Sequence, residues 1–167
     1  MKKIPYLMLA CSLALFIAGC GESPIAAVGK PAPVFDTVNM DGDVWSLSKQ
    51  KGQVVFLNFW ATWCAPCREE MPSMQRLYDK LPKDTFKMVA LYNRDKPELV
   101  KSFAAKLGIT IPILSDEQNI IGERYGITGL PETFIIDKSG VIREKYIGPY
   151  EWDTPEIVAM LMKYINE

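Results

Sequence analysis

The hydrophobic positions of the chain follow two different periods, and the change from one to the other comes just after residue 60. Residues 54–60, VVFLNFW, form a continuous apolar run of strand length, which is typical of a strand buried on both faces. From Ala65 onward, apolar residues recur at spacings of three and four and predict one apolar helical face. The members of that face are Met71, Met74, Leu77, Tyr78 and Leu81.

The rest of the chain repeats this alternation of strands and helices. Asp41-Gly42, between two short alternating runs within 34–47, indicates an N-terminal β-hairpin. The other predicted elements are a strand at 86–92, a helix at about 97–107, a strand at about 111–114, a helix at about 117–125, a hairpin of 133–137 and 141–147, and a final helix at about 154–165. This order predicts an α/β fold, a central mixed sheet flanked by helices, with an antiparallel edge formed by the closing hairpin.

The first residues have the layout of an export signal. Lys2 and Lys3 precede a mostly apolar stretch at 4–17, which is too short for a membrane-spanning helix and is followed by small and polar residues. The sequence IAGC that ends at Cys20 resembles the lipobox of bacterial lipoproteins, in which the cysteine is acylated. Ordinary signal cleavage, with Cys20 left as a free thiol, is the alternative.

These signals divide the chain into three parts. We expect a lipoprotein signal peptide at 1–19, a lipidated tether at 20–33 that is rich in Ala, Gly and Pro, and a folded domain at 34–167. Lipidation also accounts for the odd thiol of the mature chain, since Cys11 would leave with the signal. The expected location is the bacterial cell envelope, with the lipid-anchored domain facing the periplasm or the outer face of the cytoplasmic membrane.

The composition argues against nucleic acid as a partner. The formal net charge is −1 over 167 residues, and the basic residues are scattered, so no concentrated positive face is available for phosphate contacts.

We expect the protein to be a monomer.

The stretch WATWCAPC, which contains Cys64 and Cys67, can be interpreted in four ways. A structural zinc site needs four ligands, and the chain has no histidine and no second cysteine pair. A purely structural disulfide would close one of the smallest possible loops, which stabilises little. The two cysteines could also be small buried hydrophobic residues. The fourth interpretation is a redox pair.

The redox interpretation accounts for the position of the pair between a buried strand and a helix. Cys64 falls at the predicted helix start, where unpaired N–H groups and the helix dipole favour a thiolate, the form that attacks disulfides. Cys67 lies one turn further along, where the helix would cover it and leave it to resolve a mixed disulfide. Pro66 is tolerated because the N–H that it lacks would have no partner in a first helical turn.

Two separated motifs resemble thioredoxins. FLNFWATWCAPC is similar to their active-site strand and turn, and YGITGLPETFIID followed by KSGVIREKYIG is similar to their cis-proline segment and closing hairpin. The closer resemblance is to the membrane-anchored TlpA/ResA family of thiol-disulfide oxidoreductases, which includes the cytochrome c maturation thioredoxins. The features shared with that family are the N-terminal hairpin, an extra strand-helix unit around residues 96 to 114, and the strings NFWATWCAPC and PETF.

The resemblance implies a thioredoxin fold and a set of site residues. Cys64 and Cys67 would form the redox-active disulfide, with no other cofactor, and Pro131 would follow a cis peptide bond beside it. The backbone of Gly129 and Leu130 would receive an extended substrate by strand addition. The implied substrate-binding surface consists of Trp63, Ala65, Pro66, Gly129, Leu130 and Glu132.

The proton chemistry needs a separate carrier. Asn58 stands where thioredoxins keep a buried aspartate, and an amide cannot accept the proton of Cys67. Glu70, three residues after Cys67 on the same helical face, is the first candidate, with a raised pKa from desolvation and a nearby thiolate. Glu132 would tune it or contact substrate. In the alternative, both carboxylates are merely solvated.

The expected function is that of an exported reductase of protein disulfides, recharged by a membrane thiol donor, with the haem-site cysteines of apocytochromes c as the substrate that the family suggests. A disulfide-forming oxidase of the same fold and a non-catalytic lipoprotein binding module are the alternatives. A peroxidase of this fold would need a threonine three residues before its cysteine, where Ala61 precedes Cys64.

We predict that palmitate labels the wild-type protein and does not label Cys20→Ala, because the acylated thiol is then absent. The variant should move from the membrane fraction to the soluble periplasm. Its retention in the membrane fraction would show that another feature anchors the protein.

Overall fold

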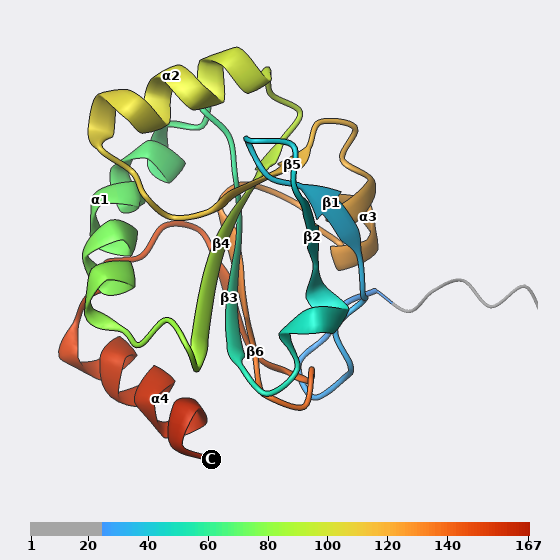
Figure 1. Cartoon of the computed structure of the whole chain (residues 1–167), viewed down its shortest axis with the longest axis vertical. Coiled ribbons are helices and arrows are strands. Elements are labelled where there is room, and N and C mark those ends of the chain that lie inside the picture. The colour runs from blue at the N-terminus through green and yellow to red at the C-terminus, as the bar shows by residue number, and fades with distance from the viewer. Residues whose placement is uncertain (1–24) are drawn as a thin grey trace, which may run out of the picture.

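The computed structural model describes residues 25–167 and contains two sheets (Figure 1). The larger sheet has five strands in the order β5-β4-β3-β6-β7, and a separate two-stranded sheet pairs β1 with β2. The strands are β1 (Asp36–Val38), β2 (Val44–Ser46), β3 (Val54–Trp60), β4 (Phe86–Asn93), β5 (Ile113–Asp116), β6 (Glu132–Ile136) and β7 (Ile142–Ile147). The helices are η1 (Leu47–Gln50), α1 (Ala65–Lys80), α2 (Pro97–Leu107), α3 (Ile120–Tyr125) and α4 (Pro155–Asn166). The predicted signal peptide and Cys20 lie outside the described residues.

Strand β3 is the centre of the large sheet because it is apolar on both faces. All seven of its residues are buried, and it pairs in parallel with β4 and antiparallel with β6. Figure 1 shows α1, α2 and α4 on one side of the sheet, and α3 with the β1–β2 hairpin on the other. The predicted α/β thioredoxin fold, with its mixed sheet and N-terminal hairpin, is therefore confirmed.

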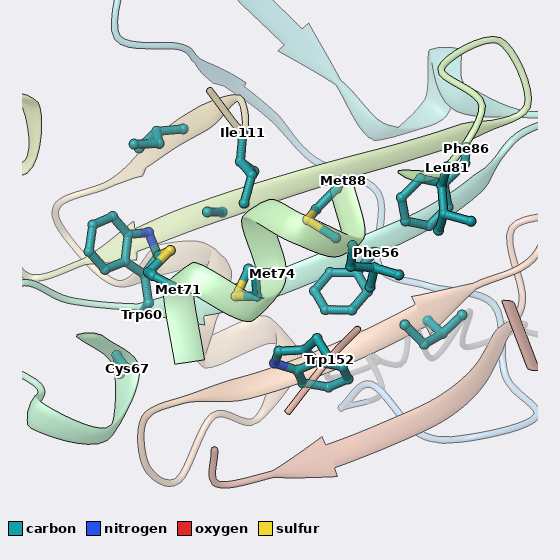
Figure 2. Packing of buried hydrophobic residues seen from close by; sticks show 14 of the residues in the cluster. Phe56, Trp60, Cys67, Met71, Met74, Leu81, Phe86, Met88, Ile111 and Trp152 are labelled. Carbon is teal, nitrogen blue, oxygen red and sulfur yellow. The ribbon is translucent and has the colours of Figure 1, made fainter. Parts of the chain in front are cut away.

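The two faces of the sheet carry separate hydrophobic cores. Alternate residues of β3 divide between them, since Phe56 and Trp60 pack with α1 and α4, whereas Leu57 and Phe59 pack with α3. On the α1 side the ring of Trp152 lies edge-on against Phe56, with ring centroids 4.7 Å apart (Figure 2). The two faces of the sheet therefore have separate apolar surroundings.

The boundaries of two elements differ from the predicted ones for local reasons. The extra unit expected around 96–114 is α2 followed by the edge strand β5, which begins at Ile113. Pro112 has no N–H to donate, and only its carbonyl bonds β4, by accepting from the N–H of Ala90 (3.0 Å). The helix predicted from residue 117 begins only at Ile120, since Asn119 has a positive φ of 60° and cannot continue a helix.

Residues 25–33 contact the domain, although the sequence analysis assigns them to the tether. Ala26 and Ala32 are buried. The N–H of Gly29 donates to the carbonyl of Ile142 (2.8 Å), and that of Ala32 to Gly140 (2.9 Å). The folded part therefore begins before residue 34, and the predicted domain boundary was placed too late because a Pro- and Ala-rich segment can pack in extended form as readily as it can remain a linker.

Candidate active site

The two cysteines lie where β3 gives way to α1. Cys64 is the N-cap of α1, and its Sγ accepts a hydrogen bond from the N–H of Cys67 (3.3 Å). The two form a disulfide, with Cα atoms 5.3 Å apart. Cys64 keeps 7% of its surface exposed and Cys67 none, so the asymmetry expected between an attacking and a covered thiol is present. Ala65 and Pro66 occupy the first turn, where Pro66 interrupts no helical hydrogen bond.

The turn before Cys64 is held by the two residues that follow β4. The N–H of Thr62 donates to Asp95 Oδ2 (2.6 Å), and Trp63 Nε1 donates to the carbonyl of Arg94 (3.3 Å). Trp63 is 60% exposed, whereas Trp60 is fully buried in the core. The structure therefore places Trp63 on the surface next to the disulfide, as the sequence analysis expects.

The loop that is expected to receive substrate, residues 128–131, lies at the same end of the sheet; we call it the docking loop. The bond between Leu130 and Pro131 is cis, and β6 starts directly after it. Because β6 runs antiparallel to β3, with Glu132 opposite Phe59, the start of β6 lies beside the end of β3 that leads to Cys64. Pro131 is buried, Leu130 is half-buried, and Gly129 is exposed.

The carboxylate of Glu70 is buried inside the protein, with only 2% of the residue exposed. Asn58 Nδ2 donates to its Oε1 (2.8 Å). Trp152 Nε1 donates to its Oε2 (2.9 Å), and so does the N–H of Tyr150 (3.2 Å). Helix α1, strand β3 and the segment after β7 therefore meet at one carboxyl group.

Burial raises the pKa of Glu70 from its ordinary value to about 7, because the anion loses its hydration. The hydrogen bonds from Trp152, Asn58 and Tyr150 act in the opposite direction and offset part of that rise. The predicted direction of the shift is confirmed. A carboxyl group with this pKa can take up and release a proton near neutral pH.

Comparison with known proteins agrees with this geometry. The AhpC/TSA family matches residues 28–145. A thiol-disulfide oxidoreductase ResA from Geobacillus thermodenitrificans is 41% identical over 128 residues, which cover 76% of this chain and 73% of the relative. The chain belongs to the thioredoxin-like AhpC/TSA family and is a ResA-like thiol-disulfide oxidoreductase. The thioredoxin-like protein YneN from Bacillus subtilis is 39% identical over 124 residues, 72% of this chain and 71% of YneN.

Solved structures support the same assignment. A thiol:disulfide interchange protein of the thioredoxin family from Chlorobium tepidum TLS is 33% identical and superimposes with a TM-score of 0.71, covering 81% of this chain and 98% of the other. StoA from Bacillus subtilis is 29% identical with a TM-score of 0.65, again over 81% and 98% of the two chains.

Two residues of the ResA-like site, Trp152 and Thr133, could not be recognised from the sequence. Trp152 packs in the core against Phe56, and its indole N–H is also a donor to Glu70. Thr133 Oγ1 accepts the second hydrogen of Asn58 Nδ2 (2.9 Å). The only available signal for Trp152 was general: a buried indole N–H needs an acceptor.

Glu132 lies on the opposite face of the sheet from Glu70. Thr133 contacts Asn58 on the α1 face, and side chains alternate along β6, so Glu132 points to the face of Phe59 and Phe134. It is completely buried. The expected roles of Glu132, contacting substrate or tuning Glu70, are therefore wrong, because strand alternation separates two carboxylates that the sequence analysis placed together.

Within residues 25–167, no group of three or more metal-ligating side chains comes together. No helix of that described part is both long and apolar enough to cross a membrane.

The raised pKa of Glu70 predicts a pH-dependent stability. Because its folded-state pKa of about 7 lies above the ordinary 4.5, the folded protein holds this proton more tightly than the unfolded chain does. The resulting stabilisation is fully present below pH 4.5 and is lost as the pH rises through 7. Relative to Glu70→Gln, the oxidised wild type should lose about 3 kcal/mol of unfolding free energy across this window.

Urea unfolding of the oxidised proteins at a series of pH values measures this difference. Glu69→Gln is the matched control, because Glu69 is the exposed neighbour on the same helix. Parallel stability curves for wild type and Glu70→Gln would show that Glu70 titrates normally.

Proposed function

We propose that the protein is an exported, lipid-anchored reductase of protein disulfides that acts through Cys64 and Cys67. The observation that carries the proposal is the placement of this pair at the start of α1, next to the cis-Pro131 loop and on the same helix as a buried carboxyl group. The exposed surface around the pair, including Trp63, offers apolar contact to a polypeptide.

The reaction transfers two electrons and two protons from the protein to the substrate disulfide. The Cys64 thiolate attacks one sulfur of the substrate disulfide, forms a mixed disulfide and releases the other sulfur as a thiolate, which takes up a proton. The Cys67 thiolate then attacks Cys64 Sγ, and the second substrate sulfur leaves. The protein ends with the Cys64–Cys67 disulfide seen in the structure, and the substrate with two thiols.

Glu70 is the proposed proton acceptor for the second step. Cys67 is fully buried and must lose its proton before it can attack. Glu70 lies three residues further along α1, on the same side of the helix, and its pKa of about 7 matches the task. Asn58 holds this carboxylate and cannot replace it as a base, since an amide does not titrate in this range.

The direction proposed is reduction of the substrate. Ala65 and Pro66, between the cysteines, offer no cationic side chain to stabilise the Cys64 thiolate strongly, which is what a powerful oxidant requires. A membrane thiol donor would return the enzyme to its dithiol form. The haem-attachment cysteines of apocytochromes c are the proposed substrate, and Cys20 would anchor the protein in the cell envelope, facing the periplasm or the outer face of the cytoplasmic membrane.

Two measurements test this function. The purified domain should catalyse dithiothreitol-driven reduction of insulin, and its reduction potential should lie near the thioredoxin value of about −270 mV rather than near the oxidant value of about −120 mV. Absence of turnover would favour the binding module, and a potential near the oxidant value would favour the oxidase.

Cys67→Ser should trap the natural substrate, because the mixed disulfide at Cys64 can no longer be resolved. Cys64→Ser is the matched control and should trap nothing. Identification of an apocytochrome c in the captured species would support the proposed substrate, and capture of other proteins alone would contradict it.

A further inference from the structure

Glu132 and Lys145 form an ion pair on the α3 side of the sheet. Lys145 Nζ lies 2.9 Å from Glu132 Oε2, and the side chains are 23% and 0% exposed. The two residues are diagonal neighbours on antiparallel strands, since Glu132 stands opposite Ile147 and Lys145 opposite Phe134. This spacing is within reach of a long side chain. A buried carboxylate is thereby neutralised from the neighbouring strand.

The other oxygen of Glu132 holds the loop in front of β6. Its Oε1 accepts hydrogen bonds from the N–H of Thr128 (2.8 Å), from Thr128 Oγ1 (3.0 Å) and from the N–H of Gly129 (3.3 Å). One carboxylate therefore ties the start of the docking loop, residues 128–131, to the sheet. Such charge-assisted bonds are about twice as strong as neutral ones.

The backbone of Leu130 is left available by this arrangement. Among residues 25–167, no hydrogen bond to the N–H or carbonyl of Leu130 is formed, while Gly129 on one side and Pro131 on the other are both fixed. The carbonyl of Pro131 accepts a hydrogen bond from Gly148 (2.9 Å). A peptide unit with a free N–H and a free carbonyl, directly before the cis-proline, is what strand addition by a substrate requires.

We propose that Lys145 is a positioning residue for substrate docking. By pairing with Glu132, it keeps the carboxylate in place to bind Thr128 and Gly129, and it thereby holds the Leu130 backbone ready for an extended polypeptide. The inference rests on the proposed reductase function and adds a residue that touches neither cysteine. Without Lys145, Glu132 is a buried charge with no counter-ion, which favours its movement toward water and release of the loop.

The first test is the steady-state kinetics of Lys145→Met, which removes the charge and keeps most of the apolar stem. The KM for insulin should rise about tenfold, and kcat should stay near the wild-type value, because only docking is weakened. Reduction of a small aromatic disulfide, which needs no strand addition, should be unchanged. Lys163→Met, at an exposed lysine on α4, is the control.

A second pair of variants separates positioning from simple loss of folding. Glu132→Gln combined with Lys145→Met leaves no buried charge and keeps a carbonyl for Thr128 and Gly129, so the KM for insulin should return toward the wild-type value. Thr128→Val removes one donor at an exposed residue and should raise that KM by a smaller factor.

The outcomes distinguish this inference from the proposed function. A wild-type protein without insulin reductase activity would overturn the reductase proposal. An active wild type, with an unchanged insulin KM in Lys145→Met and Thr128→Val, would overturn the positioning role alone. An equal loss of activity toward insulin and the small disulfide would likewise show that Lys145 does not act on docking.

Discussion

The buried carboxyl group of Glu70 is the constraint on which the active-site half of the structure depends. A charge without water is costly, so the group needs donors, and it receives them from β3 through Asn58 and from the segment after β7 through Tyr150 and Trp152. The indole of Trp152 is fixed in turn by Phe56 and Tyr146, whose ring centroids lie 4.7 and 5.2 Å away. The aromatic core thus determines how well the carboxylate of Glu70 is hydrogen-bonded, and the hydrogen bonds in turn affect the pKa of Glu70.

The central sheet separates two tasks that thiol-disulfide exchange must combine. On the α1 face lies Glu70, the proposed acceptor of the Cys67 proton. On the α3 face, the pair of Glu132 and Lys145 holds the loop that would receive substrate. The cysteines lie at the end of the sheet, where both faces can serve them. Strand alternation places the carboxylates of Glu70 and Glu132 on opposite faces of the sheet.

The sequence was most informative where a function depends on neighbouring residues. The Cys64–Cys67 pair, the strand before it and the helix after it could be predicted because composition and spacing are local signals. Trp152 could not be assigned, since it meets Glu70 across 82 positions of sequence and nothing near it marks it as a donor. Glu132 was misplaced because its position beside Pro131 says nothing about its face until the register of β6 against β3 is known.

The most direct test of this account is the pH dependence of the step in which Cys67 resolves the mixed disulfide, followed in single-turnover reactions of the reduced protein with a peptide disulfide. In the wild type and in Glu69→Gln, the rate should rise through an apparent pKa near 7, as Glu70 becomes the carboxylate that accepts the proton. In Glu70→Gln that inflection should vanish, and the rate should rise only toward the ordinary thiol pKa of about 8.5. Identical profiles in all three proteins would contradict the assignment of Glu70 as the base.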